Sequence, residues 1–413
     1  MAPISFHRRA TAAIPLTLLA LLCGFVPFAQ AESDPYYLGI SQSLGHNSNV
    51  YRINGNEVPD KFATTSLNLG FDQPIGRQRV FANASVRATR YEDITILNNT
   101  GYGLSAGLDW STIERLSGGL GVSLNRSLAN YATSGDQLQV PQNKKNEETS
   151  GQANLRVQYG LVSLLSLNAS LSHSEISYSA IEYARSEVRQ NAGSLGLTYR
   201  PSGLLTLGTA YRVTQGEYPN VPLPSGATES FDRKDIDLTA TWIASGLSTV
   251  NARLSYGRST YDTFTKRDTN GATGSLGWAW QPTGKLSFNT TLSRDTGTET
   301  SLYALANNRG TAVGDNSVST NAFALDAGYE VTSKIRVNLG TRYAKRKLVN
   351  DINNTEGRDT VTSVTLGATY ALSRAWQMGC NAGQDTGKPT DSTGVSSKYT
   401  TVNASCNVQF TIR

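Results

Sequence analysis

Histidine, cysteine and methionine are scarce in this chain, with 3, 3 and 2 residues respectively among 413. The few histidines and cysteines form no cluster with metal-ligand spacing, and no phosphate-binding loop or paired-carboxylate site stands out. His173 lies between Ser172 and Ser174, but a catalytic histidine needs a partner that orients it, and none is evident. We therefore predict no metal, no cofactor and no enzymatic activity.

Long apolar runs are also missing after residue 31, where no window holds about 18 consecutive apolar residues, so no transmembrane helix is expected. At the N-terminus, Arg8 and Arg9 precede a short apolar run over residues 14–28, and the small-residue site AQA follows at 29–31. This order is typical of a cleaved secretory signal peptide. We predict a signal peptide over residues 1–31 and a single domain over 32–413. Cleavage removes two arginines from a net charge of +5, a balance too mild to indicate a nucleic-acid partner.

The mature chain contains many stretches in which apolar and polar residues alternate. Residues 235–242 read DIDLTATW, a turn signal ASG follows at 244–246, and residues 250–256 read VNARLSY. Such period-two patterns on both sides of a tight turn predict an antiparallel hairpin with one apolar and one polar face. A soluble sheet could have the same pattern, so its recurrence decides the class.

The unit recurs to give about 18 strands, and the connections alternate between short turns and long polar loops. Residues 216–229 are expected as a Pro-rich loop and residues 295–316 as the longest loop. This asymmetry is typical of transmembrane barrels, in which periplasmic turns are short and external loops are long. We predict an all-β fold, an antiparallel up-and-down barrel in the Gram-negative outer membrane. Closure requires the strand over residues 36–45 to pair with the strand over residues 399–412, because lipid satisfies no open edge.

Aromatic residues recur at one end of the strands. Each strand that enters a short turn carries an aromatic residue in the apolar phase near its end. Amphipathic rings favour the headgroup level of a bilayer, so we predict one periplasmic girdle. Its members are Phe71, Trp110, Tyr159, Tyr199, Trp242, Trp280, Tyr329 and Tyr370.

The polar phase of the strands is expected to line a lumen, which is aqueous in a barrel of this width unless it is plugged. Its charged residues lean basic. The arginines either attract anionic solutes or brace the wall through ion pairs with inward acids. In the third long loop, Lys144 and Lys145 either form a constriction or remain solvated. The predicted lumen residues are Arg79, Arg87, Arg156, Arg212, Arg253, Arg336 and Arg342, with Asp235, Asp237 and Asp326.

Cys380 and Cys406 are equidistant from the middle of the last loop, and both fall in the apolar phase of neighbouring strands. They are expected to lie opposite each other, either as a structural disulfide, which export to an oxidising compartment favours, or as two small buried hydrophobic residues.

Four segments resemble the EpsL-like outer-membrane proteins of exopolysaccharide operons, within the larger β-barrel porin group. They are SQSLGHNSNVYR at 41–52, FDRKDIDLTATWIASGLSTVNARLSYGRSTYD at 231–262, and the closing pair MGCNAG and NASCNVQF. The resemblance implies a barrel that acts in polymer export beside an inner-membrane synthesis machinery, and it supplies no site residues. The C-terminus departs from the usual barrel ending, because Phe410 is followed by Thr-Ile-Arg rather than being terminal.

Our first functional hypothesis is a pore that exports an anionic exopolysaccharide to the cell surface. Inward amides and hydroxyls would bind sugar hydroxyls, while arginines hold carboxylates loosely. The alternative is a general or anion-selective uptake porin, and a third hypothesis is a structural or enzymatic barrel with a plugged lumen. The expected partners are outer-membrane lipid, a polysaccharide substrate and periplasmic or inner-membrane polymer-export proteins.

Overall fold

The computed structural model describes residues 35–112, 115–129, 144–160, 164–222, 228–263, 268–304, 311–350, 355–391, 396 and 398–413. The predicted signal peptide at residues 1–31 lies outside these described residues. In the described part of the chain, no helix is long and apolar enough to cross a membrane.

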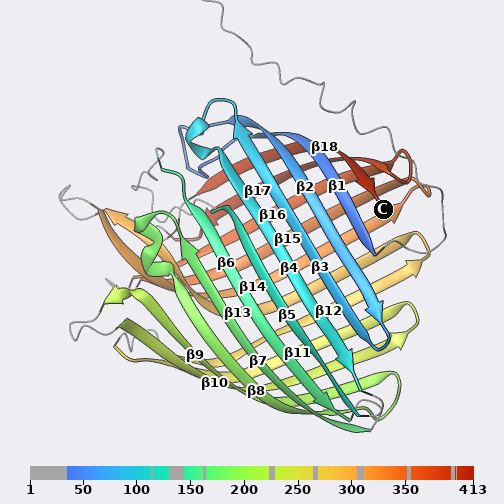
Figure 1. Cartoon of the computed structure of the whole chain (residues 1–413). Coiled ribbons are helices and arrows are strands. Elements are labelled where there is room, and N and C mark those ends of the chain that lie inside the picture. Colours follow the sequence, from blue (N-terminus) through green and yellow to red (C-terminus); the bar gives the residue numbers. More distant parts are fainter. Residues whose placement is uncertain are drawn as a thin grey trace, which may run out of the picture. The chain divides into compact units, whose positions relative to one another are not determined.

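A single 18-stranded antiparallel sheet forms the unit Pro35–Arg413. Each strand pairs with its neighbours in the sequence, as the colour order in Figure 1 shows. The strands are β1 (Tyr36–Asn47), β2 (Asp60–Ile75), β3 (Gln78–Tyr91), β4 (Asn99–Ser111), β5 (Leu116–Leu128), β6 (Glu147–Tyr159), β7 (Leu165–Tyr178), β8 (Val188–Tyr199), β9 (Leu205–Pro222), β10 (Thr228–Ser245), β11 (Ser248–Tyr261), β12 (Thr269–Thr283), β13 (Leu286–Ala304), β14 (Thr311–Glu330), β15 (Ile335–Asn350), β16 (Glu356–Ala371), β17 (Trp376–Pro389) and β18 (Tyr399–Ile412), with the 3-10 helices η2 (Thr95–Leu97) and η3 (Ile181–Ser186).

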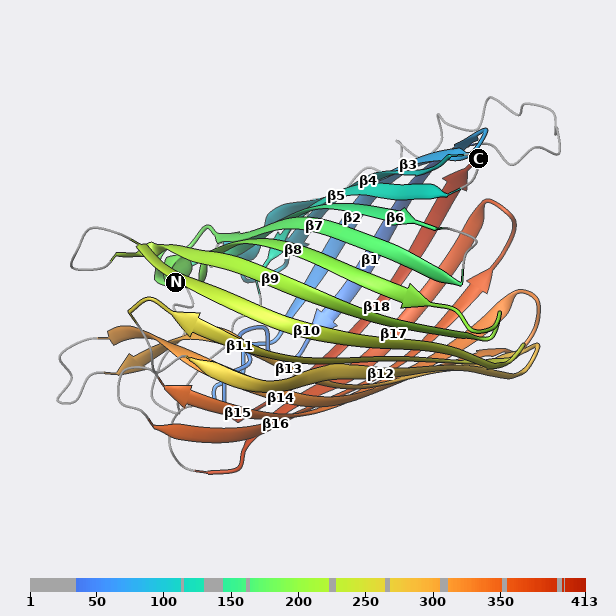
Figure 2. The ribbon, with the colours of Figure 1, turned by 90° about the horizontal axis from the view of Figure 1, so that it is seen from below.

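The sheet closes on itself through β1 and β18. Their register runs from Leu38 opposite Ile412 to Asn47 opposite Asn403, and the two strands lie side by side in Figures 1 and 2. The predicted first-to-last pairing is therefore confirmed. A closed sheet pairs its backbone N–H and C=O groups between strands and leaves no edge, which is the condition for crossing lipid as strands.

The outside of the wall is apolar and uncovered by protein. Leu44, Leu171 and Ile236 expose 64%, 62% and 56% of their surfaces. A continuous exposed band of this kind requires a lipid partner. The closed 18-stranded wall and its apolar exterior make this protein an outer-membrane β-barrel, in agreement with the predicted fold class.

The predictions of two long loops, over residues 216–229 and 295–316, are wrong for most of their length. Residues 216–222 belong to β9, and Thr228 already begins β10. Residues 295–304 and 311–316 belong to β13 and β14, which pair as far as Ala304 opposite Thr311. These hairpins extend past the membrane, where the outward face no longer needs apolar residues. The alternation of apolar and polar residues that predicts a strand therefore disappears there, although the two strands continue to pair through backbone hydrogen bonds.

Five of the buried hydrophobic residues in the described ranges form two small clusters near the external ends of strands. Tyr51 and Leu97, both from external connections, pack with Val50, Ile53 and other partly buried residues. Tyr218, Val221 and Phe231 form the second cluster, on β9 and β10. Only side chains outside the lipid need such a core, because the membrane solvates the remaining apolar surface.

Candidate functional site in the lumen

The lumen wall is the face opposite the exposed leucines, and alternation places every predicted lumen residue on it. One row of cross-strand neighbours climbs this wall. It starts next to the β2–β3 turn and ends in the external half of β11, because the strands are tilted and each neighbour stands a step higher. From β3 to β11 the row reads Arg79, Asp109, Gly119, Arg156, Ser170, Ser194, Arg212, Asp235 and Gly257.

Two of the predicted arginines brace the wall. The Arg79 Nε donates to Asp72 Oδ1 at 2.8 Å. Arg212 lies between two carboxylates, 3.3 Å from Asp235 and 3.1 Å from Asp237. An arginine held by acids on two sides has little free charge for a passing solute.

Asp235 is fully buried because two neighbours enclose it. Arg233, which the sequence analysis missed, donates from Nε to both of its oxygens at 3.0 and 2.9 Å. On the other side lies Gly257, where a Cβ atom would stand 2.1 Å from Asp235 Oδ1. The glycine therefore makes room for the carboxylate, and the signal for this role was its position opposite Asp235 in the predicted hairpin.

Four other predicted arginines have neutral partners or none. Arg87 donates to Asn125 Oδ1 at 3.3 Å, and Arg336 donates to Asn338 Oδ1 at 3.0 Å. Within the described ranges, no acid lies at ion-pair distance from Arg87, Arg156, Arg336 or Arg342. Arg253 is intermediate, 3.9 Å from Asp295. The arginines therefore divide into two groups: some brace the wall through ion pairs, and others are free to attract anionic solutes.

A hollow of about 400 Å³ lies in the wall over β5 to β10, and we call it the β5–β10 hollow. Arg156 borders it on β6 and Asp237 on β10, with Asn168 and Ser170 between them. Gly119 and other residues with small side chains leave the space. Asn168 donates to Thr198 Oγ1 at 2.6 Å, and the hydroxyls of Ser170 and Ser194 are 2.7 Å apart.

A second hollow, of about 540 Å³, lies over β13 to β17, and we call it the β13–β17 hollow. It contains Arg336 and Arg342 on β15 and a single carboxylate, Asp326. The remaining lining includes the amides of Asn289, Asn338 and Asn381 and the hydroxyls of Ser363 and Thr365. Both hollows therefore combine guanidinium groups with uncharged hydrogen-bonding groups, at volumes typical of small-molecule sites.

The wall as a whole is mixed in charge and not basic, which corrects the expectation from the sequence. The acids that were missed share the parity of the arginines and could have been counted from the alternation alone. Several are paired, as when Arg346 Nε donates to Asp359 Oδ1 at 2.8 Å. The additional inward acids include Asp72, Asp109, Asp295, Asp359 and Asp385.

The external mouth is partly covered by η3, in the β7–β8 connection. This helix contacts β9 beside it and also β13 and β14 farther around the wall. Lys144 forms an ion pair with Glu182 of η3, and its ammonium group holds the pKa of Glu182 below the usual range. Lys145 lies 3.1 Å from Glu147. Both lysines therefore form ion pairs at the mouth, Lys144 with η3 and Lys145 with the start of β6.

The predicted girdle residues lie on the outward face at the periplasmic ends of the even-numbered strands. Tyr159 and Trp242 each expose 52% of their surfaces. The sequence analysis missed aromatic partners on the same strand and on the neighbouring strand. The Trp280 ring stacks on Trp278 at 5.3 Å and on Phe288 at 5.5 Å between centroids. A function as an interfacial belt remains a prediction.

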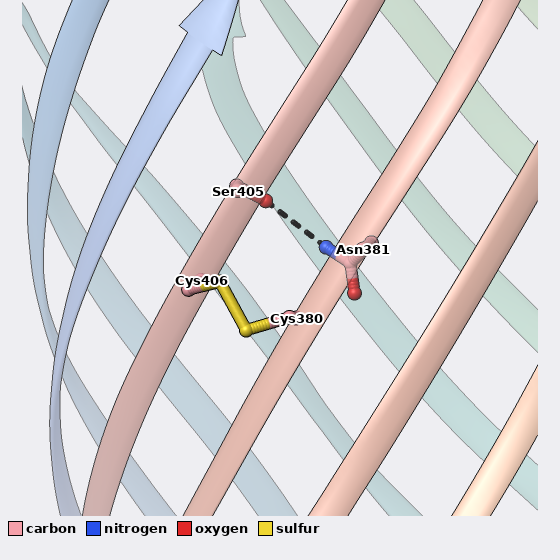
Figure 3. Close-up of a disulfide and its surroundings, with 4 residues drawn as sticks. All are labelled: Cys380, Asn381, Ser405 and Cys406. Atoms are coloured by element: carbon pink, nitrogen blue, oxygen red, sulfur yellow. Dashed lines mark hydrogen bonds between the residues drawn. A yellow bond between two sulfur atoms is a disulfide. The ribbon is translucent and has the colours of Figure 1, made fainter.

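Cys380 and Cys406 stand directly opposite each other and are joined by a disulfide (Figure 3). Beside the bridge, Asn381 donates to Ser405 Oγ at 3.0 Å, as Figure 3 shows. His173 faces outward and bonds through Nδ1 to Asn191 at 2.8 Å. Its serine neighbours, Ser172 and Ser174, have the opposite parity and face the lumen.

The chain matches no protein-family model and no curated protein. Among solved structures it is similar to outer membrane protein OpdK from Pseudomonas aeruginosa, with 12% identity, 91% of this chain and 99% of that chain covered, and a TM-score of 0.49. It is also similar to the outer membrane channel DcaP of Acinetobacter baumannii, with 12% identity, 91% and 96% covered, and a TM-score of 0.46. These likenesses concern the barrel fold alone. By its closed wall, apolar exterior and polar lumen, the chain is a transmembrane β-barrel.

Proposed function

We propose that this barrel is an outer-membrane conduit for an anionic, hydroxyl-rich solute, and that its physiological load is an acidic exopolysaccharide leaving the cell. The observation that carries the proposal is the composition of the two hollows. Each places an arginine without an acid partner among the described residues beside amide and hydroxyl groups. This combination suits a sugar that bears a carboxylate.

Conduction needs binding that is favourable and also weak. The guanidinium groups of Arg156, Arg336 and Arg342 attract a carboxylate through charge-assisted hydrogen bonds. Asp237 and Asp326, at the same hollows, repel it. A polymer can therefore exchange its hydrogen bonds between the β5–β10 hollow and the β13–β17 hollow, and it can move through the lumen without being trapped.

A second candidate is an uptake porin for small anionic solutes. The hollow volumes of about 400 and 540 Å³ favour it, because they match a small molecule as well as one or two sugar units of a chain. Export rests on the resemblance to EpsL-like proteins, and the geometry of the wall serves either direction. The two candidates share the lumen and differ in what crosses it in the cell.

The arginine assignment is tested by reversal potentials in planar bilayers under a KCl gradient. Replacing Arg336 and Arg342 with Gln should shift the reversal potential toward cation preference. The Asp72→Asn/Arg79→Gln variant is the control, because it removes both members of an ion pair and leaves the net charge of the lumen unchanged. Equal shifts in the two variants would contradict a role for the β13–β17 hollow in selectivity.

The direction of transport is tested in cells. Deleting the gene should lower the yield of surface polymer while leaving the growth rate on small anionic nutrients unchanged. The opposite outcome, normal polymer with impaired growth on such nutrients, would favour the uptake porin and refute export.

A further inference from the structure

A third hollow, of about 980 Å³, lies on the outside of the wall over β9 to β15. Its floor includes four small residues: Ala240 and Ala252, which are cross-strand neighbours on β10 and β11, and Ala272 and Gly274, which are successive outward positions on β12. Leucines on either side form its walls, including Leu254 and Leu276, which are 54% and 44% exposed. We call this feature the outer groove. It is a recess in a face that otherwise meets lipid.

Arg294 and Lys345 stand at the external end of the outer groove. Arg294 lies opposite Gly274, which has no side chain to displace it. Its Nε donates to the carbonyl oxygen of Ala272 at 3.1 Å, and its Nη1 donates to Asn321 Oδ1 at 3.3 Å. Lys345 is the cross-strand neighbour of Asn321 on the other side. The two cations are therefore held on either side of one amide.

Neither cation is neutralised in the part of the chain that the structure describes. No acid there lies at ion-pair distance from Arg294 or Lys345, and both are exposed. Lys234 and Arg258 form an adjacent exposed pair on β10 and β11. In contrast, Lys347 is paired with Glu356 at 3.0 Å. Free positive charge therefore stands above the outer groove.

The position along the strands places these cations at the external surface of the membrane. Arg294 follows the periplasmic start of β13 by eight residues, and Lys345 follows that of β15 by ten. A tilted barrel strand crosses the hydrocarbon core in about 9–11 residues. The outer groove then lies in the outer leaflet with the cations at headgroup level, where a charged outward residue costs little.

We propose that the outer groove binds lipid A of lipopolysaccharide, the phosphorylated multi-acyl lipid of the outer leaflet. Arg294 and Lys345 take one phosphate, Arg258 and Lys234 lie within the same band for a second, and acyl chains fill the recess. Phosphate oxygens accept charge-assisted bonds from guanidinium and ammonium groups. A lipid with two phosphates and several chains fits a groove that spans seven strands better than a lipid with one phosphate and two chains. The site is independent of what the lumen conducts.

The test uses the full-length purified barrel in detergent, titrated with bisphosphorylated lipid A and followed by native mass spectrometry. The Arg294→Gln/Lys345→Gln variant should bind about 30-fold more weakly, since each cation near a charged membrane surface contributes about a factor of five. The matched control is Arg358→Gln/Lys388→Gln, which removes the same charge from exposed outward positions on β16 and β17. It should bind like the wild type.

Removing both phosphates from lipid A should weaken wild-type binding by more than the double substitution does. It should weaken the Arg294→Gln/Lys345→Gln variant less than the wild type, because that variant has only the second phosphate contact, at Arg258 and Lys234, left to lose. Retained gel mobility of unheated samples verifies that each variant is folded. Equal losses in the two double variants would mean that the charge of the belt alone attracts lipid, and would overturn the site. Equal affinity for a glycerophospholipid or for inorganic phosphate would overturn the choice of ligand.

Discussion

Replacing Asp235 with Ala should destabilise the barrel more than any other loss of a single lumen carboxylate discussed above. The Asp235 side chain has no exposed surface, whereas its partners Arg212 and Arg233 expose 30% and 23%. The substitution removes two bonds from Arg233 and one contact with Arg212. It leaves two guanidinium groups facing each other across the vacated position.

The magnitude follows from which partners remain. Breaking a buried ion pair by removing one member costs about 3–5 kcal/mol. Arg212 keeps Asp237 at 3.1 Å, and both arginines reach lumen water. We therefore expect a loss of about 3 kcal/mol in unfolding free energy, at the low end of that range. Asp72→Ala removes an exposed pair with Arg79 and should change stability far less.

The assay is equilibrium urea unfolding of the barrel refolded in lipid vesicles, followed by tryptophan fluorescence and by the gel mobility of unheated samples. An Asp235→Ala variant as stable as Asp72→Ala would show that the buried carboxylate does not stabilise the barrel. It would mean that lumen water screens the Arg212–Asp235–Arg233 cluster as effectively as it screens the exposed Arg79–Asp72 pair.

Three further predictions concern the lumen, the bridge and the mouth. Gly367→Trp should lower single-channel conductance without unfolding the barrel, because a Cβ there meets its nearest neighbours at 3.6 and 3.7 Å and the ring extends into the β13–β17 hollow. Cys380→Ser/Cys406→Ser should lose about 2–4 kcal/mol in urea unfolding, the usual effect of a bridge, with no change in conductance. Lys144 lowers the pKa of Glu182, so the pair stabilises the mouth above the ordinary carboxyl pKa and this contribution is lost as the pH falls through the lowered value. Conductance should then rise in acid for the wild type, and Glu182→Gln should abolish that rise.

The architecture could be predicted because it repeats. The strands and their parity follow from the alternation that a lipid exterior and an aqueous lumen impose on every strand. The pairing of the first strand with the last follows because lipid satisfies no open edge. The same reasoning placed Cys380 opposite Cys406, since equal distances from a loop fix the register of a hairpin. The external halves of β13 and β14 were missed because no lipid imposes alternation there.

The lumen chemistry could be predicted only in part. The alternation along each strand predicts which arginines face the lumen. It does not predict which of them an acid neutralises, because the ion pairs join residues on different strands, and the relative heights of those residues depend on the strand register. Arg79 and Arg156 look alike in the sequence. Asp72 binds the first, whereas the second borders a hollow that exists because Gly119 is small. The outer groove was missed for the same reason, since its floor joins alanines and glycine from several strands.

In the proposed function, the lumen conducts an anionic, hydroxyl-rich polymer. The most direct measurement is single-channel recording of the purified barrel in a planar bilayer with an acidic oligosaccharide added on the periplasmic side. We predict an open-channel current interrupted by blockades whose frequency rises with oligosaccharide concentration and falls when Arg156, Arg336 and Arg342 are replaced with Gln. A barrel without conductance, or one whose current the oligosaccharide leaves uninterrupted, would rule out conduction of such a polymer through the lumen.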